Sequence, residues 1–319
     1  MPINVFVTRN FKHMSQVAAE EIKKIILQTL KKNEECVLGL ATGHSPTGAY
    51  KYLAKAANEK EFDSSRLRSF NLDEYVGLPG GNAQQRVMHR ESYCYFMIQE
   101  FFGLLNHKFI ETCVPYGALI EQKVLVSELK AHPEDWREAG ADSGRSVVIK
   151  SKPKSPYLAW IRKEILDGYA RKIKKAGGID LQIIGVGGKG HVAFHESGIP
   201  FSGSKVLLVK LDENTVENAV IDGHFSSKKE CPHYAISMGA QLVYKAQSVV
   251  LLASGRRKSD PVAESLLGQM TPAVPISYGQ RYAEKGGNLI YVIDRQAARK
   301  LLNSEEELGR KGIRLQSLV

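Results

Sequence analysis

The segment Leu181-Gln-Ile-Ile-Gly-Val-Gly-Gly-Lys-Gly-His-Val-Ala-Phe-His-Glu196 decides the fold that this chain is expected to adopt. It opens with a largely apolar run and continues with four glycines, a histidine and a carboxylate. This order is typical of a buried strand that leads into a tight loop, because glycine tolerates positive φ and a close approach of the backbone to a ligand. Open α/β sheets bind ligands in such loops, at the carboxyl ends of parallel strands. The segment therefore predicts an α/β protein with its site after this strand.

Strand and helix patterns alternate along the rest of the chain. Strands are expected near residues 4–8, 36–41, 67–72, 110–114, 181–185, 206–211, 249–253 and 289–293, and helices near 16–31, 46–58, 91–105, 157–175, 240–246, 261–268 and 295–302. Such alternation predicts a doubly wound, mostly parallel sheet with helices on both faces, in a modified Rossmann-like arrangement.

The expected organisation is a single α/β domain over residues 1–303, followed by a C-terminal tail, residues 304–319. The polar stretch 121–155 breaks the alternation and is interpreted as an insertion on the rim of the domain. A short helix over 124–131 and a strand over 146–149 fit its pattern. A folded flap and a disordered excursion are both compatible with this composition.

Composition narrows the class of protein. The apolar fraction of 43% and the charged fraction of 24% are ordinary for a globular protein. No apolar run approaches the roughly 20 residues that a membrane-spanning helix needs, and the first residues lack the features of a signal peptide, so a cytoplasmic protein without a membrane partner is expected. The cysteines Cys36, Cys94, Cys113 and Cys231 are scattered, which argues against a disulfide framework or a metal site.

The net charge of +10 admits nucleic acid or anionic metabolites as partners. The basic clusters carry no interleaved aromatic residues that would stack on bases, so no nucleic-acid partner is predicted. A phosphorylated small substrate fits this charge, and a homo-oligomer is compatible with the sequence.

Two segments are candidates for binding an anion. Thr42-Gly43-His44-Ser45 lies between an apolar strand and a helix expected to open at Pro46, so backbone N–H groups and hydroxyls meet at a helix N-terminus. A tight turn capped by Ser45 is the structural alternative. The cations that end in Lys258 follow another strand at a helix start, where they oppose the helix dipole unless an anion neutralises them.

Three side chains are candidates for proton transfer. Asp73, with Glu74 beside it, follows an interior strand, and a carboxylate at the mouth of an apolar strand can have a raised pKa that suits a general base. His191 stands among glycines after a buried strand and titrates near neutral pH. Glu196 lies five residues further on and can orient that imidazole or tune its charge.

These segments, in this order, resemble the glucosamine-6-phosphate deaminase/isomerase family, which is related to the 6-phosphogluconolactonases. The most specific matches are Thr42-Gly-His-Ser-Pro-Thr47, Phe70-Asn-Leu-Asp-Glu-Tyr-Val-Gly-Leu78, Glu91-Ser-Tyr93 and Gly190-His-Val-Ala-Phe-His-Glu196. The Asp-Glu-Tyr segment and the Phe-His-Glu ending favour the deaminase branch over the lactonases.

The resemblance implies isomerisation and deamination of an amino-sugar 6-phosphate, such as glucosamine 6-phosphate, to a ketose 6-phosphate and ammonia. It implies that His191 helps to open the sugar ring, that Glu196 orients His191, and that Asp73 carries the C2 proton to C1. It also implies that the loop of Thr42, Gly43, His44 and Ser45 holds the phosphate together with Lys258. The resemblance implies no metal or organic cofactor.

Two positions depart from the family pattern. The family has aspartate or asparagine directly before the Gly-His pair, within the ring-opening group, where this chain has Lys189. Lys189 is therefore a candidate catalytic residue that would disfavour a protonated His191 or reach a substrate oxygen. The family also carries a phosphate-binding arginine in an Asn-x-Arg-Phe-Phe segment, and the corresponding stretch Thr215–Ser226 contains no arginine. A lactone hydrolase and a non-catalytic sugar-phosphate-binding regulator are the alternative functions.

Overall fold

A parallel sheet forms the centre of the computed structural model, which describes residues 3–203 and 205–319. Its strand order is β13-β1-β12-β11-β8-β2-β3-β5, and all of the pairings between neighbours are parallel. The strands are β1 (Ile3–Thr8), β2 (Cys36–Leu40), β3 (Leu67–Asn71), β5 (Glu111–Cys113), β8 (Leu181–Ile184), β11 (Ser248–Ala253), β12 (Asn288–Asp294) and β13 (Ile313–Ser317). The parallel sheet that the alternating pattern predicts is thereby confirmed.

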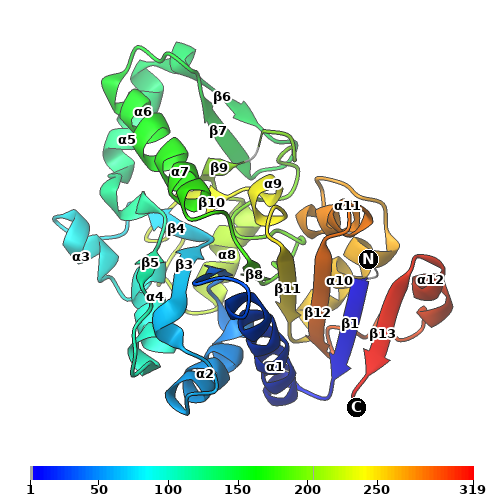
Figure 1. The fold of residues 1–319 in the computed structure, drawn as a ribbon. Coiled ribbons are helices and arrows are strands. Elements are labelled where there is room, and N and C mark those ends of the chain that lie inside the picture. The colour runs from blue at the N-terminus through cyan, green and yellow to red at the C-terminus, as the bar shows by residue number, and fades with distance from the viewer. Residues whose placement is uncertain (1–2, 204) are drawn as a thin grey trace.

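Helices cover both faces of this sheet (Figure 1). The helices are α1 (Phe11–Leu30), α2 (His44–Asn58), α3 (Ala83–Val87), α4 (Tyr93–Glu100), α5 (Gln122–Ala131), α6 (Pro156–Trp160), α7 (Asp167–Lys175), α8 (Glu213–Ile221), α9 (Ala240–Val243), α10 (Ser259–Leu267), α11 (Tyr278–Glu284) and α12 (Glu305–Arg310). One apolar cluster joins the sheet to α1, α2 and α4, and a second joins the opposite face to α7, α10 and α11. Every residue of β2, β8 and β11 is buried, as is typical of parallel strands covered on both sides.

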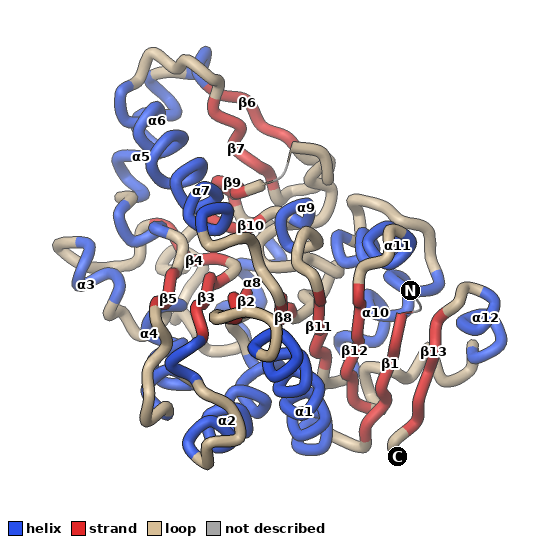
Figure 2. Tube along the Cα trace, viewed as in Figure 1, coloured by secondary structure: helices blue, strands red, loops and turns tan. Residues whose placement is uncertain are grey.

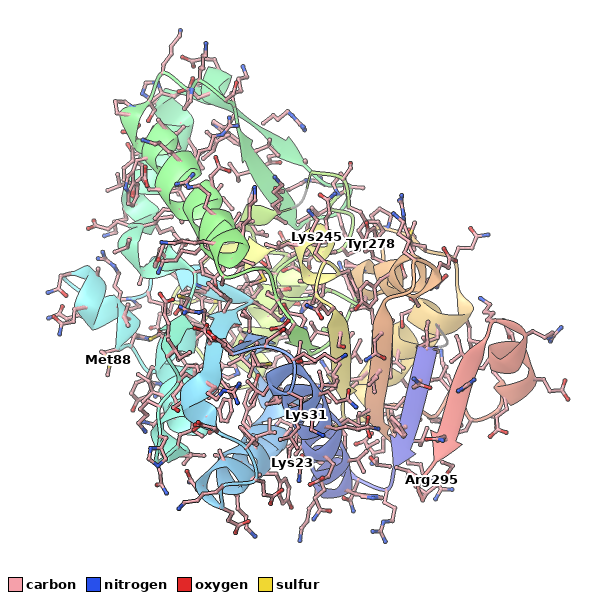
Figure 3. The ribbon with its side chains drawn as sticks, in the orientation of Figure 1. Lys23, Lys31, Met88, Lys245, Tyr278 and Arg295 are labelled. Carbon is pink, nitrogen blue, oxygen red and sulfur yellow. The ribbon has the colours of Figure 1, made fainter. Side chains whose placement is uncertain are left out.

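Helix α1 shows how the sequence pattern becomes packing. Met14, Ala18 and Ile22 recur at helical spacing and are buried against the sheet. Its N-terminus is capped by the side chain of Asn10, which accepts a hydrogen bond from the N–H of His13 at 3.0 Å. Lys12 and Lys24 are exposed on the other face. Figure 3 labels Lys23 of this helix and Lys31, which directly follows it. The apolar face is therefore what fixes α1 on the sheet.

A second, antiparallel sheet was not expected from the sequence. Its order is β4-β10-β9-β7-β6, with β4 (Asp73–Val76), β6 (Trp136–Ala139), β7 (Arg145–Ile149), β9 (Val206–Lys210) and β10 (Tyr234–Met238). β4 was missed because it begins with two carboxylates only one residue after β3 ends, so that no turn signal separates the two strands. Apolar side chains of this sheet belong to the same core cluster as those of α7, α10 and α11.

The stretch 121–155 is folded, so the disordered alternative is wrong. The expected helix and strand are present as α5 and β7, and β7 pairs with β9 in antiparallel register. Leu125 and Leu129 of α5 are buried in the main core. Figure 2 shows the β6–β7 hairpin beside α5 and α6, at the end of the molecule opposite α2. The stretch is thus part of the second sheet, and its status as an insertion stays a prediction.

The last residues form part of the main sheet, which corrects the expectation of a tail over 304–319. β13 pairs in parallel with β1, from Ile313 opposite Ile3 to Ser317 opposite Val7. Leu308 of α12 is fully buried in the core. The prediction of a helix over residues 295–302 is also wrong. Hydrogen bonds of i→i+3 and i→i+4 spacing alternate there, so the segment forms successive turns.

Other helix boundaries differ from the expected ones in simple ways. The helix expected over 91–105 ends at Glu100 and is followed by a 3₁₀ turn, Phe102–Leu104. The helix expected over 157–175 contains a π-helical turn, Ile161–Leu166, between α6 and α7. α3 and α8 are short, and the sequence pattern did not indicate them.

Because Leu308 is buried and Leu318 is exposed, replacing each with alanine should change the free energy of unfolding by very different amounts. Leu308→Ala should lower the free energy of unfolding by about 2–5 kcal/mol, because it opens a cavity in the core. Leu318, which is 40% exposed, is the matched control, and Leu318→Ala should change it by less than about 0.5 kcal/mol. Urea titration measures both. Equal midpoints for the two variants would show that α12 is not part of the folded core.

Candidate active site

The candidate site lies where the path of the main sheet reverses direction. From β2 the chain continues outward to β3 and β5, whereas from β8 it continues to β11 and β12 on the other side. The neighbouring strands β2 and β8 therefore flank a topological switch point, where open α/β sheets form a crevice. The loops after β2, β3, β8 and β11 all leave the same edge of the sheet. They carry the residues singled out from the sequence.

His191 and Glu196 form a close pair of side chains in the loop after β8. Nδ1 of His191 lies 3.1 Å from Oε2 of Glu196, whose side chain is buried. Gly187 makes room for the imidazole, because a Cβ at Gly187 would fall 1.9 Å from Nε2 of His191. With Nδ1 held by the carboxylate, Nε2 is the nitrogen that can exchange a proton with a substrate. The predicted pairing of these two residues is present in the structure.

Asp73 is the first residue of β4 and is placed by strand pairing. It lies opposite Ser237 of β10, and Oγ of Ser237 accepts a hydrogen bond from the N–H of Phe194 at 3.0 Å. This bond ties the strand of Asp73 to the loop that carries His191 and Glu196. Asp73 and the His191–Glu196 pair therefore belong to one site.

The environment of Asp73 suits a general base. Its side chain is buried, and Oδ1 has no hydrogen-bond partner among the described residues. Burial raises the pKa of Asp73 well above its usual range, and the charges of Glu74 and Glu196 raise it further. Because the charge of Glu196 raises the pKa of Asp73, the carboxyl groups of Asp73 and Glu196 interact electrostatically. A buried carboxyl group with a raised pKa in a crevice is typical of proton-transfer sites.

Glu74, the residue after Asp73, fixes the position of β4 through hydrogen bonds to the start of α4. Its Oε2 accepts hydrogen bonds from Oγ of Ser92 at 2.8 Å and from the N–H of Cys94 at 3.2 Å. Its Oε1 accepts from the N–H groups of Tyr75 at 2.9 Å and Tyr93 at 3.1 Å. Burial raises the pKa of Glu74 to about 7, against the lowering effect of these bonds. Glu74 thus joins β4 to the N-terminus of α4 and holds Asp73 in place.

The loop of Thr42, Gly43, His44 and Ser45 is shaped to receive an anion. α2 begins at His44, earlier than expected, and its N-cap is Gly43, with φ at +91°. No side chain of residues 3–203 and 205–319 caps this helix, so capping by Ser45 is wrong and the first N–H groups are left for another acceptor. A Cβ at Gly43 would meet no atom within 4 Å, which shows open space above the loop.

Lys258 lies at the start of α10, after β11. Burial lowers the pKa of Lys258, the charge of Arg257 lowers it further, and Asp222 acts in the opposite direction. Arg257 pairs with Asp222 at 3.2 Å, whereas no described acidic side chain pairs with Lys258. A partly desolvated ammonium without a counter-ion gains stability from a bound anion. Lys258 and the loop of Thr42 to Ser45 leave the same edge of the sheet, separated only by β8.

Lys189 is held by two carboxylates. Its Nζ lies 3.0 Å from Oδ2 of Asp142 and 3.1 Å from Oδ2 of Asp212. The hydrogen bond from Lys189 to Asp142 is the main cause that raises the pKa of the lysine. These ion pairs favour a permanently charged, positioning group over a group that exchanges protons with a substrate.

His195 is a structural residue of the site that sequence reasoning missed. Its Nε2 donates to the carbonyl of Ile199 at 3.0 Å, and its Nδ1 accepts from the N–H of Ala240 at 3.0 Å. Burial lowers the pKa of His195 to about 4, so the ring stays neutral near pH 7. The sequence shows that His191 and His195 lie in one loop. Their burial distinguishes them, because His195 is fully buried and His191 is partly exposed.

The described residues offer no alternative centre of metal or thiol chemistry. Over residues 3–203 and 205–319, no three His, Cys, Asp or Glu side chains gather in a way that could hold a metal ion. Burial raises the pKa of each free thiol, to about 12 for Cys36 and about 11 for Cys94, Cys113 and Cys231. In this same part of the chain, no helix combines the length and the apolarity that crossing a bilayer requires.

Comparison with known sequences identifies close relatives, although no family model matches the chain. The glucosamine-6-phosphate deaminase of Clostridium botulinum (strain Kyoto / Type A2) is 34% identical over 300 residues, which cover 94% of this chain and 99% of the relative. That of Thermoanaerobacter pseudethanolicus is 34% identical over 296 residues, covering 93% of this chain and 94% of the relative.

Solved structures share the fold. A monomeric glucosamine-6-phosphate deaminase superimposes with a TM-score of 0.70 at 24% identity, covering 93% of this chain and 99% of that one. The 6-phosphogluconolactonase of Trypanosoma brucei superimposes with a TM-score of 0.58 at 16% identity, covering 94% and 99% of the two chains. The larger score belongs to the deaminase.

The four hydrogen bonds of Glu74 predict a graded loss of stability. Glu74→Ala should lower the free energy of unfolding by about 3 kcal/mol or more, because buried donors lose their acceptor. Glu74→Gln keeps one carbonyl acceptor and should lose less. Glu59, which is 55% exposed and 3.7 Å from Lys55, is the matched control, with an expected change below about 0.5 kcal/mol. Urea unfolding that gives the same midpoint for Glu74→Ala and Glu59→Ala would exclude the anchoring role.

Proposed function

Because this chain belongs to the glucosamine-6-phosphate deaminase family, we propose that Asp73, His191 and Glu196 isomerise and deaminate an amino-sugar 6-phosphate. The chain is an enzyme of this family, and its compared relatives are named glucosamine-6-phosphate deaminases. The reaction proposed for it converts an amino-sugar 6-phosphate to a ketose 6-phosphate and ammonia. The single observation that carries the assignment of residues is the convergence of Asp73 with the His191–Glu196 pair, linked through Ser237 and Phe194.

The phosphate of the substrate positions the sugar. The uncapped N–H groups at the start of α2 and the unpaired Lys258 supply donors and positive charge at one edge of the sheet. Fixing the phosphate converts the later proton transfers into reactions between groups that are already aligned. In this site the loop of Thr42, Gly43, His44 and Ser45 thus binds the end of the sugar distant from the reacting carbons.

His191 opens the sugar ring. Its Nε2 delivers a proton to the ring oxygen as the bond between that oxygen and C1 breaks, and the C1 hydroxyl proton passes to a water molecule as C1 becomes a carbonyl. Glu196, 3.1 Å from Nδ1, holds the orientation of the imidazole and stabilises its protonated form. Ring opening produces the free aldehyde that makes the C2 proton acidic.

Asp73 then moves the proton that isomerises the sugar. Its carboxylate removes the C2 proton while the C1 oxygen takes back a proton from water, which gives an enol. The acid formed at Asp73 then returns its proton to C1. The amine on C2 becomes an iminium group, which water hydrolyses to a ketone with release of ammonia. The raised pKa of Asp73 strengthens it as a base while its burial excludes competing solvent.

Ammonia release from a panel of hexosamine 6-phosphates, run beside 6-phosphogluconolactone, tests this function. Glucosamine 6-phosphate or an epimer such as galactosamine 6-phosphate should release ammonia, and the best substrate identifies the epimer. Hydrolysis of the lactone without ammonia would replace the proposal with the lactonase alternative. Binding without turnover would replace it with the regulator alternative.

Asp73→Asn should abolish ammonia release while preserving the binding of 2-amino-2-deoxyglucitol 6-phosphate, because the amide cannot accept the C2 proton. In the unmodified enzyme, kcat/KM should fall as the pH falls through the pKa of Asp73, at a pH well above 3.8, because the base must be ionised. Asp63→Asn is the control, since Asp63 precedes β3 at its other end. Ammonia release by Asp73→Asn at the wild-type rate would remove Asp73 from the mechanism.

Lys258→Ala should raise KM for phosphorylated substrates about 10- to 100-fold, since a hydrogen bond between charged groups contributes roughly 1.5–3 kcal/mol. The matched control is Lys245→Ala, because Lys245 is exposed and precedes β11 at its amino end (Figure 3). Steady-state kinetics of both variants give the comparison. The phosphate lies elsewhere if KM is the same in the two.

The remaining expectations about the protein's surroundings stay predictions. A cytoplasmic location and the lack of a nucleic-acid partner are expectations from the sequence pattern, and a homo-oligomeric state is compatible with it. The sugar-phosphate substrate agrees with the named activity of the relatives.

A further inference from the structure

The turn between β6 and β7, residues 140–144, rests on the loop that carries Glu196. The N–H of Ala141 donates to the carbonyl of Gly198 at 3.1 Å. A Cβ at Gly144 would fall 2.6 Å from Cβ of Glu196, so the backbone of the turn touches this side chain directly. A hairpin that precedes Glu196 by some fifty residues in the sequence therefore forms one wall around it.

Ion pairs tie the same turn to the loop. Lys189 bridges Asp142 of the turn and Asp212, which follows β9, at 3.0 Å and 3.1 Å. Oγ of Ser143 donates to the same oxygen of Asp212 at 2.7 Å. The N–H of Asp212 in turn donates to Oε1 of Glu196 at 3.4 Å. Three separate segments thus meet at the carboxylate that holds His191.

We propose that Lys189, Asp142 and Asp212 form a positioning cluster that holds Glu196 against His191 and sets the charge felt by this pair. The inference rests on the proposed function, in which His191 and Glu196 open the sugar ring. It assigns Lys189 a role through other residues, so Lys189 is a positioning residue.

The cluster is fully charged in the folded protein. Burial opposes the ionisation of Asp212, but bonds from Ser143, Asn214 and Lys189 lower its pKa. The hydrogen bond from Lys189 is the main cause that lowers the pKa of Asp142. Two carboxylates and one ammonium therefore stand beside Glu196. Removing the ammonium leaves surplus negative charge near the pair, whereas removing one carboxylate leaves surplus positive charge.

Other titratable groups near the pair are few and remain constant in the test. His191 faces Glu196 and interacts electrostatically with the neutral His195. Glu196 also faces Asp73 of β4. Among the described residues, neither His195 nor Asp73 forms an ion pair with Lys189 or Asp142. A change in the cluster therefore acts on the His191–Glu196 pair through the charge of the cluster itself.

Two near-isosteric variants test the proposal with opposite signs. Lys189→Met removes the positive charge and should raise the pKa of His191, since surplus negative charge favours the imidazolium. Asp142→Asn removes a negative charge and should lower the pKa of His191. Each shift should be about 0.5 pH unit, the size expected for a partly exposed charge a few ångströms away. NMR titration of ¹⁵N-labelled histidine, with His191→Gln used for assignment, measures both.

Kinetics supply the second readout. Both variants should lower kcat about 3- to 10-fold with KM unchanged, because the loop that carries Glu196 loses a constraint while the phosphate site is untouched. Lys300→Met is the matched control, since it breaks an exposed ion pair with Asp260 at 2.9 Å outside the site. It should change neither the pKa of His191 nor kcat.

The outcomes separate the two proposals. Opposite shifts in the pKa of His191 support the cluster, whether or not the wild-type protein releases ammonia. Shifts of the same sign would indicate loss of packing alone and would overturn the cluster, as would shifts no larger than those of Lys300→Met. A wild-type protein that releases no ammonia contradicts the proposed function and leaves the NMR test of the cluster intact. If Lys189→Met fails to fold, Asp142→Asn alone decides by the direction of its shift.

Discussion

The candidate site depends on a link through Ser237, which pairs with Asp73 across two strands and accepts a hydrogen bond from Phe194. Asp73 and Ser237 are paired across β4 and β10, and Ser237 accepts the hydrogen bond of Phe194 from the loop after β8. The parallel sheet supplies the strand ends, and the antiparallel sheet links the strand of Asp73 to the loop that carries His191. Without β10 the loop after β3 and the loop after β8 would share an edge of the sheet without a fixed distance between their side chains.

Much of the main sheet can be predicted from the sequence because its strands are nearly continuous apolar runs. β2, β8 and β11 are buried on both faces, and their carboxyl ends carry glycines and polar residues that stand out in the pattern. The pairing of His191 with Glu196 follows from five residues of separation in one tight loop. Proximity along the chain is what made this part of the site accessible to sequence reasoning.

The remaining features depend on contacts between distant segments. β4 and β10 are short, and polar residues hide their strand character: β4 begins with two carboxylates, and Ser237 interrupts the apolar run of β10. The partners of Lys189 lie 47 and 23 residues away, so no local pattern indicates them. Lys189 with Asp142 and Asp212 carries one net negative charge. The edge strand β13 was missed because its apolar residues are few and pair only with β1.

Buried carboxyl groups give the site its chemistry at a cost in stability. Asp73 and Glu74 are both buried, and burial raises the pKa of each, so each opposes ionisation in the folded state. Glu74 offsets this with four hydrogen bonds, whereas Oδ1 of Asp73 finds no partner in the part of the chain that the structure describes. An unsatisfied buried acid persists in a folded protein when the surrounding contacts over-determine its position, and such groups are common at sites of proton transfer.

A crystal structure with a bound open-chain amino-sugar alcohol 6-phosphate tests the central claim most directly. The account predicts one ligand whose phosphate contacts the start of α2 and Lys258, whose C1 and C2 lie beside Asp73, and whose remaining hydroxyls face Nε2 of His191. A ligand whose reacting carbons approach only one of these two side chains, with the other beyond the span of a single hexose, would contradict it.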